Sequence, residues 1–371
     1  MTGTEATTKK ALVAMSGGVD SSVAAYLMKE NGFLPVGVTM MLHEEDAASI
    51  VGTHSCCTPD DIEDARVVAS TLGISFHVVN FLEGFRECII TDFIETYMRG
   101  ETPNPCIECN RYMKFGRLFE MAEKEGCEKV VTGHYARIEY DEKSEIYRLK
   151  RAVDKTKDQT YVLYFLDQQQ LSKLAFPDGE YEKTEIREIA EREGLFVASK
   201  HDSQDICFVP DGDYAGFIER NRDDLPGEGD FLDMDGNVIG KSKGYFHYTI
   251  GQRKGLGISS TAPLYVTKII PEKNQVILGS NDDLFTREVH AINFNLISMP
   301  ENVTYQGDDI LMHVTAKVRY RAKDTSGVLT LHGDKTATML FDEPVRAVTP
   351  GQSLVVYDGE YCVGGGIINE G

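Results

Sequence analysis

The chain has 371 residues and a mass of 41.3 kDa, which is long for one ordinary domain and predicts two or three. Hydrophobic residues make up 42% and charged residues 26%, a globular composition that excludes a disordered or fibrous chain. The net charge of −21 argues at first sight against a nucleic-acid partner. However, residues 241–371 hold 13 Lys and Arg against 14 Asp and Glu, so the acidity belongs to the first two thirds.

Membrane association and a disulfide scaffold are not expected. Only a short apolar run at residues 11–15 follows the N-terminus, and no stretch of about 18 apolar residues occurs. We therefore expect a soluble, cytoplasmic protein without a membrane partner. Its eight cysteines are too few to staple a chain of this length, so any cysteine that matters is expected to act as a thiol or a ligand.

Strand and helix patterns alternate in the first part of the chain. Strands are predicted at 11–15, 35–41, 75–79 and 130–132, and helices at 21–31, 62–72 and 85–97. This alternation predicts an α/β fold with a parallel sheet covered on both faces.

The pattern changes after Cys207, where turn signals and short β-rich runs replace the helices. Short strands are predicted at 265–270, 275–278, 310–320, 327–331, 336–341 and 353–357. We therefore expect a catalytic domain at 1–210, a small central domain at 211–280 and a C-terminal antiparallel β-barrel at 281–371.

The first motif lies between the first predicted strand and the first predicted helix, where residues 16–22 read Ser-Gly-Gly-Val-Asp-Ser-Ser. Two glycines let the backbone approach a phosphate, and the amides of the turn and the helix N-terminus point toward it. The Gly-Lys-Ser/Thr ending of a Walker A loop is missing. The alternative is an ordinary glycine-rich turn in which Ser or Asp caps the helix.

This heptapeptide resembles the pyrophosphate loop of N-type ATP pyrophosphatases, which cleave ATP between the α- and β-phosphates and adenylate an oxygen of their substrate. The loop alone is equally typical of GMP synthetase, argininosuccinate synthetase, NAD synthetase and tRNA-thiolating enzymes. It therefore indicates nucleotide chemistry without fixing the substrate.

Three cysteines lie in two further motifs. Cys106 and Cys109 lie in the sequence Thr-Pro-Asn-Pro-Cys-Ile-Glu-Cys-Asn at 102–110, a spacing that can chelate a metal or pair as a redox couple. Cys207 lies in Asp-Ser-Gln-Asp-Ile-Cys-Phe at 202–208, and taken alone it is more typical of a small buried residue. Cys56 and Cys57 are adjacent in a loop, an arrangement that is more often incidental.

The motifs together resemble the bacterial tRNA-specific 2-thiouridylase family, whose members replace the C2 oxygen of the wobble uridine with sulfur. The resemblance spans nearly the whole chain. It rests on the two motifs above, the pyrophosphate loop, Lys-Asp-Gln-Thr-Tyr at 157–161, Gly-Gln-Arg-Lys-Gly-Leu-Gly at 251–257, Arg-Tyr-Arg at 319–321 and the ending from Phe341 onward.

The resemblance implies an N-terminal ATP-pyrophosphatase domain of the adenine nucleotide α-hydrolase type, a small central domain and a C-terminal β-barrel. It also implies an ATP site that uses Mg²⁺. The residues expected to bind ATP are Ala14, Met15, Ser16, Gly17, Gly18, Val19, Asp20, Ser21, Met40 and Gly133. Met40 is equally well explained as a core residue.

For catalysis the resemblance implies adenylation of the uridine oxygen, followed by attack of a sulfur nucleophile on C2. Cys207 would carry the sulfur as a persulfide received from a sulfur-relay protein or a cysteine desulfurase. Cys109 would reduce that persulfide, closing a Cys109–Cys207 disulfide, or help to activate it.

One position departs from the family pattern. Many members have Asp where this chain has Cys106, and that Asp was assigned the role of general acid/base, so this role is in doubt here. The three thiols of Cys106, Cys109 and Cys207 provide an alternative, a [4Fe–4S] cluster with one open iron that holds hydrosulfide.

The tRNA partner would be one with a wobble uridine, and the resemblance implies contacts along the whole chain. The residues expected to contact tRNA are Asn104, Pro105 and Cys106 at the target base, and His134, Lys157, Asp158, Gln159, Arg319, Tyr320 and Gln352 elsewhere. The alternative for Arg319 and Tyr320 is a polar strand face of the barrel. Lys241, Lys243, Arg253 and Lys254 are either further phosphate contacts or a solvated basic loop.

Two other functions remain open at this stage. A ligase that acts on a small metabolite would not require Cys109 and Cys207. A non-catalytic tRNA-binding protein would leave the pyrophosphate loop unused.

Overall fold

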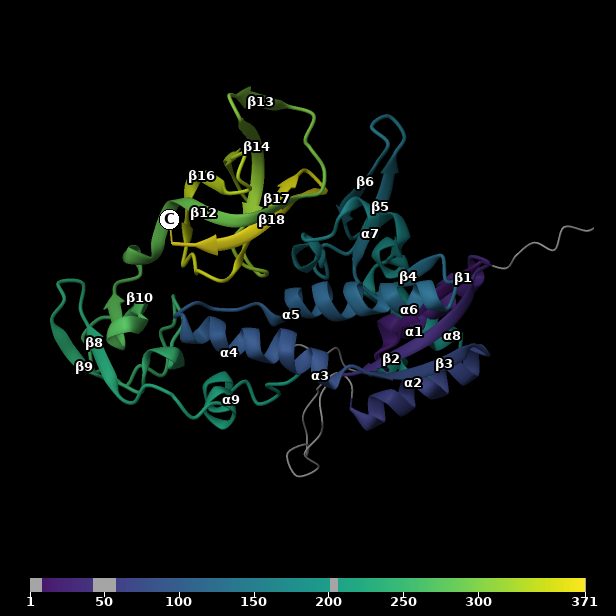
Figure 1. Cartoon of the computed structure of the whole chain (residues 1–371), viewed down its shortest axis with the longest axis horizontal. Coiled ribbons are helices and arrows are strands. Elements are labelled where there is room, and N and C mark those ends of the chain that lie inside the picture. The colour runs from purple at the N-terminus through teal and green to yellow at the C-terminus, as the bar shows by residue number, and fades with distance from the viewer. Residues whose placement is uncertain (1–8, 43–57, 201–205, 371) are drawn as a thin grey trace, which may run out of the picture. The chain divides into compact units, whose positions relative to one another are not determined.

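The computed structural model describes residues 9–42, 58–200 and 206–370 (Figure 1). Cys56, Cys57 and the first four residues of the Cys207 motif lie outside these ranges. The chain forms two compact units, which are described in turn. The first comprises residues 1–89, 106–211 and 360–362, and the second comprises 90–105, 212–359 and 363–371. No helix within the described ranges is long and apolar enough to cross a membrane.

The first unit is built on a parallel sheet with the strand order β3-β2-β1-β4-β7. Its strands are β1 (Lys10–Ala14), β2 (Leu34–Met41), β3 (Ser75–Asn80), β4 (Lys129–Val131) and β7 (Leu174–Ala175). The central strands are apolar and buried because helices cover both faces of such a sheet. The predicted parallel α/β fold is therefore confirmed.

The strand order places a topological switch point between β1 and β4. From β1 the chain moves outward to β2 and β3, and then returns to the other side of β1 as β4. In open α/β sheets the crevice beyond the carboxyl ends of such strands is the usual ligand site. The loops at 15–18 and 132–134 follow β1 and β4, so both lie at this edge.

Helices surround this sheet. Helix α1 (Val19–Glu30) contacts β1 and β2 and packs against α2 (Pro59–Leu72) and α8 (Lys183–Arg192), and α6 (Leu118–Lys124) contacts β1 and β4. The unit also contains α3 (Leu82–Phe85), η1 (Arg86–Ile90), α5 (Pro105–Glu108), η2 (Cys109–Arg117), β5 (Ala136–Asp141), β6 (Ile146–Arg151), η3 (Thr160–Leu163), α7 (Gln168–Lys173), η4 (Pro177–Glu180) and η5 (Phe196–Ser199).

The predicted helix at 85–97 is not continuous. The segment divides into the short α3, the wide π-helical turn η1 and α4 (Thr91–Met98). The boundary between the two units falls at the end of η1, after Ile89. Residues 109–117 form a second π-helical segment, which begins at Cys109 and directly follows the short helix that contains Cys106.

The second unit begins with α4 and includes a small mixed sheet. Its strand order is β10-β11-β8-β9, with β8 (Gly229–Leu232), β9 (Val238–Ser242), β10 (Tyr265–Ile270) and β11 (Gln275–Gly279). Helix α9 (Tyr214–Asn221) packs on α4, where Tyr97 and Tyr214 stack with ring centroids 4.4 Å apart. The short turns η6 (Tyr245–His247), η7 (Pro271–Lys273) and η8 (Asp282–Leu284) complete this part.

A closed antiparallel barrel ends the chain. The order β12-β16-β15-β14-β17-β18 closes because β12 pairs with both β16 and β18. The strands are β12 (Phe285–Leu296), β14 (Asp309–Lys317), β15 (Thr325–Leu331), β16 (Ala337–Arg346), β17 (Ser353–Asp358) and β18 (Tyr361–Asn369), and β13 (Val303–Gln306) pairs with β14. Closure removes exposed sheet edges. The predicted barrel is confirmed, although β14 ends at Lys317, before the predicted end at 320.

Candidate active site

The pyrophosphate loop is closed by its own serines. The hydroxyl of Ser21 accepts a hydrogen bond from the amide of Ser16 at 3.1 Å and donates to the carbonyl of Gly18 at 3.2 Å. The hydroxyl of Ser22 donates to the same carbonyl at 2.8 Å. Gly18 is the N-cap of α1 but offers no side chain, so the first amides of the helix have no side-chain cap. Such amides suit an anionic ligand.

Two glycines in this region leave no room for a side chain. Gly17 has φ +71°, and a Cβ there would lie 2.2 Å from the carbonyl oxygen of Asp61 on α2. A Cβ on Gly133, which follows β4, would lie 2.7 Å from the amide nitrogen of Ser21. The turn after β4 therefore rests directly on the start of α1. The structure thus places Gly133 beside the loop, and its predicted contact with ATP stays a prediction.

The two methionines expected near the nucleotide are both buried. Met15 is 2% exposed and Met40, near the end of β2, is 7% exposed. The carbonyl of Met15 accepts a hydrogen bond from Thr39 at 2.6 Å, which fixes the loop to β2. A core role for Met40 accords with this burial, and its contact with ATP stays a prediction. Ala14, the last residue of β1, is half-buried and Val19 is buried.

Asp20 is held by groups that are distant in sequence. The ammonium of Lys183, at the start of α8, lies 2.6 Å from Oδ1 of Asp20 and is only 10% exposed. The hydroxyl of Tyr135 donates to the same oxygen at 2.8 Å, and Lys183 lies over the Tyr135 ring at 5.7 Å. A cation is thereby placed beside the loop whose amides suit an anion.

Asp178 is a fully buried carboxyl close to this pair. Within the described ranges neither of its carboxyl oxygens has a hydrogen-bond partner. Burial raises the pKa of Asp178 well above its ordinary value, and the negative charge of Asp20 raises it further, whereas Lys183 lowers it. Burial thus favours the protonated form of Asp178, whereas Lys183 forms its ion pair with Asp20.

A second lysine binds the other side of the loop. Nζ of Lys200 donates to the carbonyl of Gly17 at 3.1 Å, to Asp61 at 2.6 Å and to Asp64 at 2.5 Å. Burial alone would lower the pKa of Lys200, but its hydrogen bonds to the two carboxylates outweigh this and raise it. Asp61 also closes the capping box of α2 with Thr58. Lys200 thus ties α2 to the loop.

Sequence reasoning missed Lys183, Lys200, Tyr135 and Asp178. Asp20 and Lys183 are 163 positions apart, and Lys200 and Gly17 are 183 apart. No local pattern links them, because only the packing of α8 on α1 brings these side chains to the loop. The one sequence signal for Lys183 and Lys200 is that they are charged residues at the ends of the segment 183–200, whose apolar residues otherwise belong to the core.

The cysteines of the two motifs differ in exposure. Cys106 is exposed, whereas Cys109 and Cys207 are half-buried, and all three belong to the first unit. Phe208, next to Cys207, packs edge-on against Phe85 with ring centroids 5.7 Å apart. Within the described ranges no group of three or more Cys, His, Asp or Glu side chains is arranged to hold a metal ion.

The Lys-Asp-Gln segment is joined to the turn after β4. The side-chain oxygen of Gln159 accepts a hydrogen bond from the backbone amide of Tyr135 at 2.9 Å. The backbone amide of Gln159 donates to the Tyr135 carbonyl at 2.8 Å. Asp158 is buried, where it accepts from Arg151 at 3.2 Å and from Thr160 at 2.8 Å. Lys157 is half-buried. Asp158 thus fixes the backbone of residues 157–160. The tRNA contacts of Lys157, Asp158 and Gln159 stay predictions.

His134 lies in a buried aromatic cluster. Its ring is near Phe115 and Phe176, both at 5.8 Å between centroids, and Nδ1 is 2.6 Å from the hydroxyl of Thr132. Burial lowers the pKa of His134 well below its ordinary value, and the charge of Lys114 lowers it further. The imidazole is therefore neutral. Its predicted tRNA contact is untested, and 6% exposure leaves little of the ring for such a contact.

In the second unit, residues expected at the target base meet the end of the chain. The side-chain amide of Gln352 donates to the carbonyls of Thr102 and Pro103, both at 3.0 Å. The amide of Thr102 in turn donates to the carbonyl of Pro350 at 2.9 Å. Gln352 therefore positions the backbone directly before Asn104 and Pro105. This is a more definite role than the general tRNA contact expected from sequence.

Arg319 and Tyr320 follow β14 in the same unit. The guanidinium of Arg319 donates to the carbonyl of Ile250 at 2.9 Å and to the hydroxyl of Thr349. Tyr320 is 38% exposed. The structure therefore joins Arg319 to the segment around 250 and leaves the Tyr320 ring partly accessible.

Three family models match the chain in succession. Their descriptions are a tRNA methyl transferase HUP domain over residues 9–211, a tRNA methyl transferase PRC-barrel domain over 215–280 and an aminomethyltransferase beta-barrel domain over 287–368. A crystal structure of a 4-thiouridine synthetase–RNA complex with bound ATP aligns at 18% identity over 57% of this chain and 50% of that chain. Its TM-score of 0.36 is too low to support an inference about the site.

Curated relatives match over almost the entire length. The tRNA-specific 2-thiouridylase MnmA of Clostridioides difficile (strain 630) is 48% identical, over 98% of both chains. The tRNA-specific 2-thiouridylase MnmA 1 of Thermoanaerobacter sp. (strain X514) is 49% identical over 97% of both chains. The tRNA-specific 2-thiouridylase MnmA of Acetivibrio thermocellus is 45% identical over 97% of this chain and 99% of its own. The chain therefore belongs to the tRNA-specific 2-thiouridylase family.

Proposed function

We propose that this chain synthesises 2-thiouridine at the wobble position of tRNA, with ATP activating the C2 oxygen and a cysteine persulfide supplying the sulfur. The observation that carries the proposal is the loop at the switch point between β1 and β4, with Gly133 against α1 and Lys183 against Asp20, in a chain of this family. A phosphate site of this kind suits nucleotide activation.

Activation is needed because the oxygen of a uridine carbonyl is a poor leaving group. Attack of that oxygen on the α-phosphorus of ATP forms a new P–O bond and releases pyrophosphate. The amides of residues 16–18 and the ammonium groups of Lys183 and Lys200 lie where they would offset the charge of the departing pyrophosphate. Mg²⁺ would enter bound to the phosphates and neutralise part of the same charge.

Sulfur transfer follows on the activated carbon. The terminal sulfur of a Cys207 persulfide attacks C2, and AMP leaves with the original oxygen. The Cys109 thiolate then attacks Sγ of Cys207, which releases the sulfur on C2 as 2-thiouridine and leaves a Cys109–Cys207 disulfide. A dithiol reductant restores the two thiols, and a persulfide donor, a sulfur-relay protein or a cysteine desulfurase, reloads Cys207.

A [4Fe–4S] cluster at Cys106, Cys109 and Cys207 is the alternative. Among the described residues no group of three or more Cys, His, Asp or Glu side chains is arranged to hold a metal ion, and we base the proposal on the persulfide. No step is therefore routed through iron. Iron analysis of anaerobically prepared enzyme distinguishes the two mechanisms: colourless, iron-free, active enzyme is expected, and iron that is lost with activity in Cys106→Ala would contradict the persulfide mechanism.

The tRNA would contact both units. Asn104, Pro105 and Cys106 are proposed at the target base, which must leave the anticodon stack to reach the activating site. Gln352 supports this segment through the backbone carbonyls of Thr102 and Pro103. Arg319 and Tyr320 offer a guanidinium and a ring face, the groups on which unpaired bases stack.

The test is nucleoside mass spectrometry on unmodified tRNA incubated with the protein, ATP-Mg²⁺ and a persulfide donor. We expect 2-thiouridine that depends on ATP and is lost in Cys207→Ser, while Cys207→Ser still releases pyrophosphate when tRNA is present. The matched control is Cys127→Ser, because Cys127 is a half-buried cysteine of the same unit whose pKa burial raises, which makes it a poor nucleophile. Pyrophosphate release without tRNA, and no thiouridine, would instead indicate a ligase for a small metabolite.

A further inference from the structure

A long segment of the second unit carries no carboxylate, although the chain as a whole is strongly acidic. Residues 236–271 contain no Asp or Glu. The basic residues in this segment are Lys241, Lys243, Arg253, Lys254 and Lys268. A cationic stretch in a chain of net charge −21 is the electrostatic pattern expected where a polyanion binds.

The cations of this segment are not all used within the fold. Lys241 pairs with Asp230 at 2.6 Å and Lys268 with Glu370 at 3.6 Å. Within the described ranges, Lys243, Arg253 and Lys254 form no ion pair with a carboxylate, and Arg253 and Lys254 are exposed. Their charge is therefore available to a ligand.

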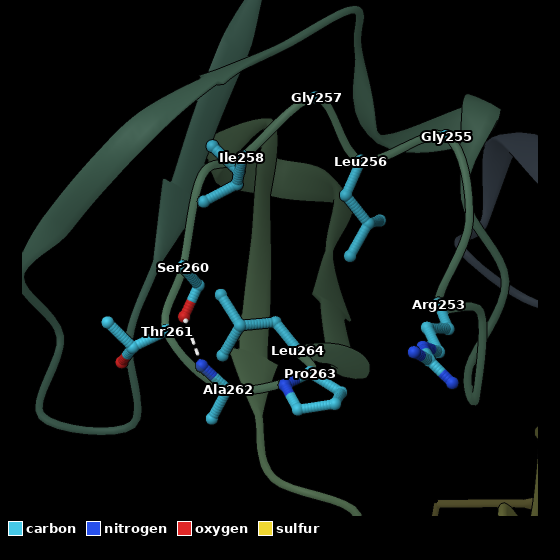
Figure 2. A pocket seen from close by; sticks show the side chains of 10 residues that line it. All are labelled: Arg253, Gly255, Leu256, Gly257, Ile258, Ser260, Thr261, Ala262, Pro263 and Leu264. Carbon is cyan, nitrogen blue, oxygen red and sulfur yellow. Dashed lines mark hydrogen bonds between the residues drawn. The ribbon is translucent and has the colours of Figure 1, made fainter.

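The same segment folds back on itself to form a pocket of about 490 Å³ between Arg253 and Leu264 (Figure 2). Leu256 and Leu264 extend into the space that the loop encloses, and Arg253 stands at one edge of it. Ser260 lies on the opposite wall, where its hydroxyl accepts a hydrogen bond from the amide of Ala262 at 3.4 Å. The lining therefore combines the apolar side chains of Leu256 and Leu264 with polar groups and a cationic side chain at one edge. Such a mixture suits a ligand with an apolar face, polar edges and a negative charge.

The pocket wall is packed against the strands beside it. A Cβ on Gly240 of β9 would lie 2.3 Å from Cδ1 of Ile258, so the glycine leaves the space in which Ile258 sits. At the other end, Gly251 has φ +88° and its amide donates to the carbonyl of Val266 on β10 at 2.8 Å. The loop is therefore anchored on both sides by the small sheet.

Arg319 lies beside the residues that precede the pocket. The guanidinium that donates to the Ile250 carbonyl lies 3.8 Å from the Cβ position of Gly251, two residues before Arg253. Arg346 lies equally close to that position and covers the ring of Tyr265, which directly follows Leu264. Positive side chains thus run from Arg319 to the mouth of the pocket within one unit.

From this arrangement we infer that the pocket at 253–264 binds one unpaired nucleotide of the tRNA substrate, with its base over Leu256 and Leu264 and its phosphate at Arg253 and Lys254. The inference rests on the proposed function for the identity of the RNA. Unpaired bases can enter a concave site that a stacked duplex cannot, and both apolar side chains and a guanidinium plane accept the face of a base.

The experiment measures the affinity of the full-length protein for unmodified tRNA as a function of salt concentration. Arg253→Ala is expected to weaken binding about tenfold and to lower the salt slope by about 1, as loss of one phosphate contact does. Ala262→Trp, which fills the pocket without changing a charge, is expected to weaken binding about tenfold with an unchanged slope. Lys273→Ala is the matched control, because Lys273 is an exposed lysine of the same unit beside Glu272, and it should bind as the unaltered protein does.

A photo-crosslinker placed at position 262 identifies the nucleotide. A cross-link to one unpaired nucleotide supports the inference, whereas cross-links to base-paired stems alone, or none, overturn it. If the unaltered protein binds and thiolates tRNA while Arg253→Ala and Ala262→Trp match it in affinity, only this inference is wrong. If the unaltered protein does not bind tRNA, the proposed function itself is wrong.

Discussion

The pyrophosphate loop and the carboxylate-free segment at 236–271 use positive charge in opposite ways. Around the loop, Lys183 pairs with Asp20, and Lys200 pairs with Asp61 and Asp64. In the segment, Arg253 and Lys254 are exposed and form no ion pair within the described ranges. The comparison teaches that the two lysines near the loop pair their charge with carboxylates of the fold, whereas Arg253 and Lys254 keep theirs exposed.

The largest expected effect concerns Lys183. Lys183→Met removes the cation that pairs with Asp20, so we expect a loss of about 2–4 kcal/mol in the free energy of unfolding. Pyrophosphate release should fall by about 100-fold or more, because one fixed charge near the phosphates is lost. The control is Lys173→Met, whose pair with Glu123 is exposed and should contribute less than about 0.5 kcal/mol. Equal effects of the two variants would contradict the comparison.

Gly133→Ala tests whether the turn after β4 must touch α1. The added methyl would meet the amide nitrogen of Ser21, so either the turn or the helix start has to move, at a cost of about 2 kcal/mol. The KM for ATP should rise more than kcat falls, because the loop is displaced from its ligand. Gly194→Ala has open space around it and costs only about 1 kcal/mol through its φ of +69°. Thermal unfolding and ATP titration check both.

Asp178→Asn tests whether the pKa of Asp178 is raised, through the pH dependence of the free energy of unfolding. The folded-state pKa of Asp178 lies above its unfolded value, so its contribution to stability is fully present below the unfolded pKa and is lost as the pH rises toward the folded pKa. The variant, which cannot ionise, should therefore gain stability over the unaltered protein as the pH rises from about 4, by about 1.4 kcal/mol per pH unit in that window. Denaturant unfolding at pH 5, 6 and 7 measures this, and a constant difference would show that Asp178 ionises normally.

The smallest expected effect on stability comes from substitutions in the carboxylate-free segment at 236–271. Arg253→Ala and Lys254→Ala should change the free energy of unfolding by less than about 0.5 kcal/mol, because neither side chain makes an ion pair within the fold. Denaturant unfolding of both variants beside Lys183→Met makes the contrast quantitative. A large loss in either segment variant would mean that these cations also support the fold.

The elements with a clear hydrophobic period were predictable. The parallel strands β1, β2 and β3 and the barrel strands lie close to where alternation and turn residues indicated. The π-helical turns at 86–90 and 109–117 were not, because one extra residue in a helical turn leaves the apolar period nearly intact. The division of the predicted helix at 85–97 between two units was hidden for the same reason.

The candidate site was predictable only where it is contiguous. The composition and position of residues 16–22 indicate a phosphate-binding loop, and the structure places Gly133 beside it. The lysines at 183 and 200 reach the loop only through packing of α8 and η5 on α1, which a single sequence does not encode locally. The structure also shows that Gln352 supports the backbone before Asn104, and its contact with RNA stays a prediction.

The hydrogen bonds from Gln352 also affect the order in which the chain folds during synthesis. Thr102 and Pro103 leave the ribosome early, but their hydrogen-bond donor, Gln352, lies 250 and 249 positions later, near the last strand. Closing so long a loop has an entropic cost that only a finished barrel can offset. We therefore expect the segment before Asn104 to take its final form only after Gln352 has been synthesised, and a nascent chain stalled before that residue lacks both hydrogen bonds.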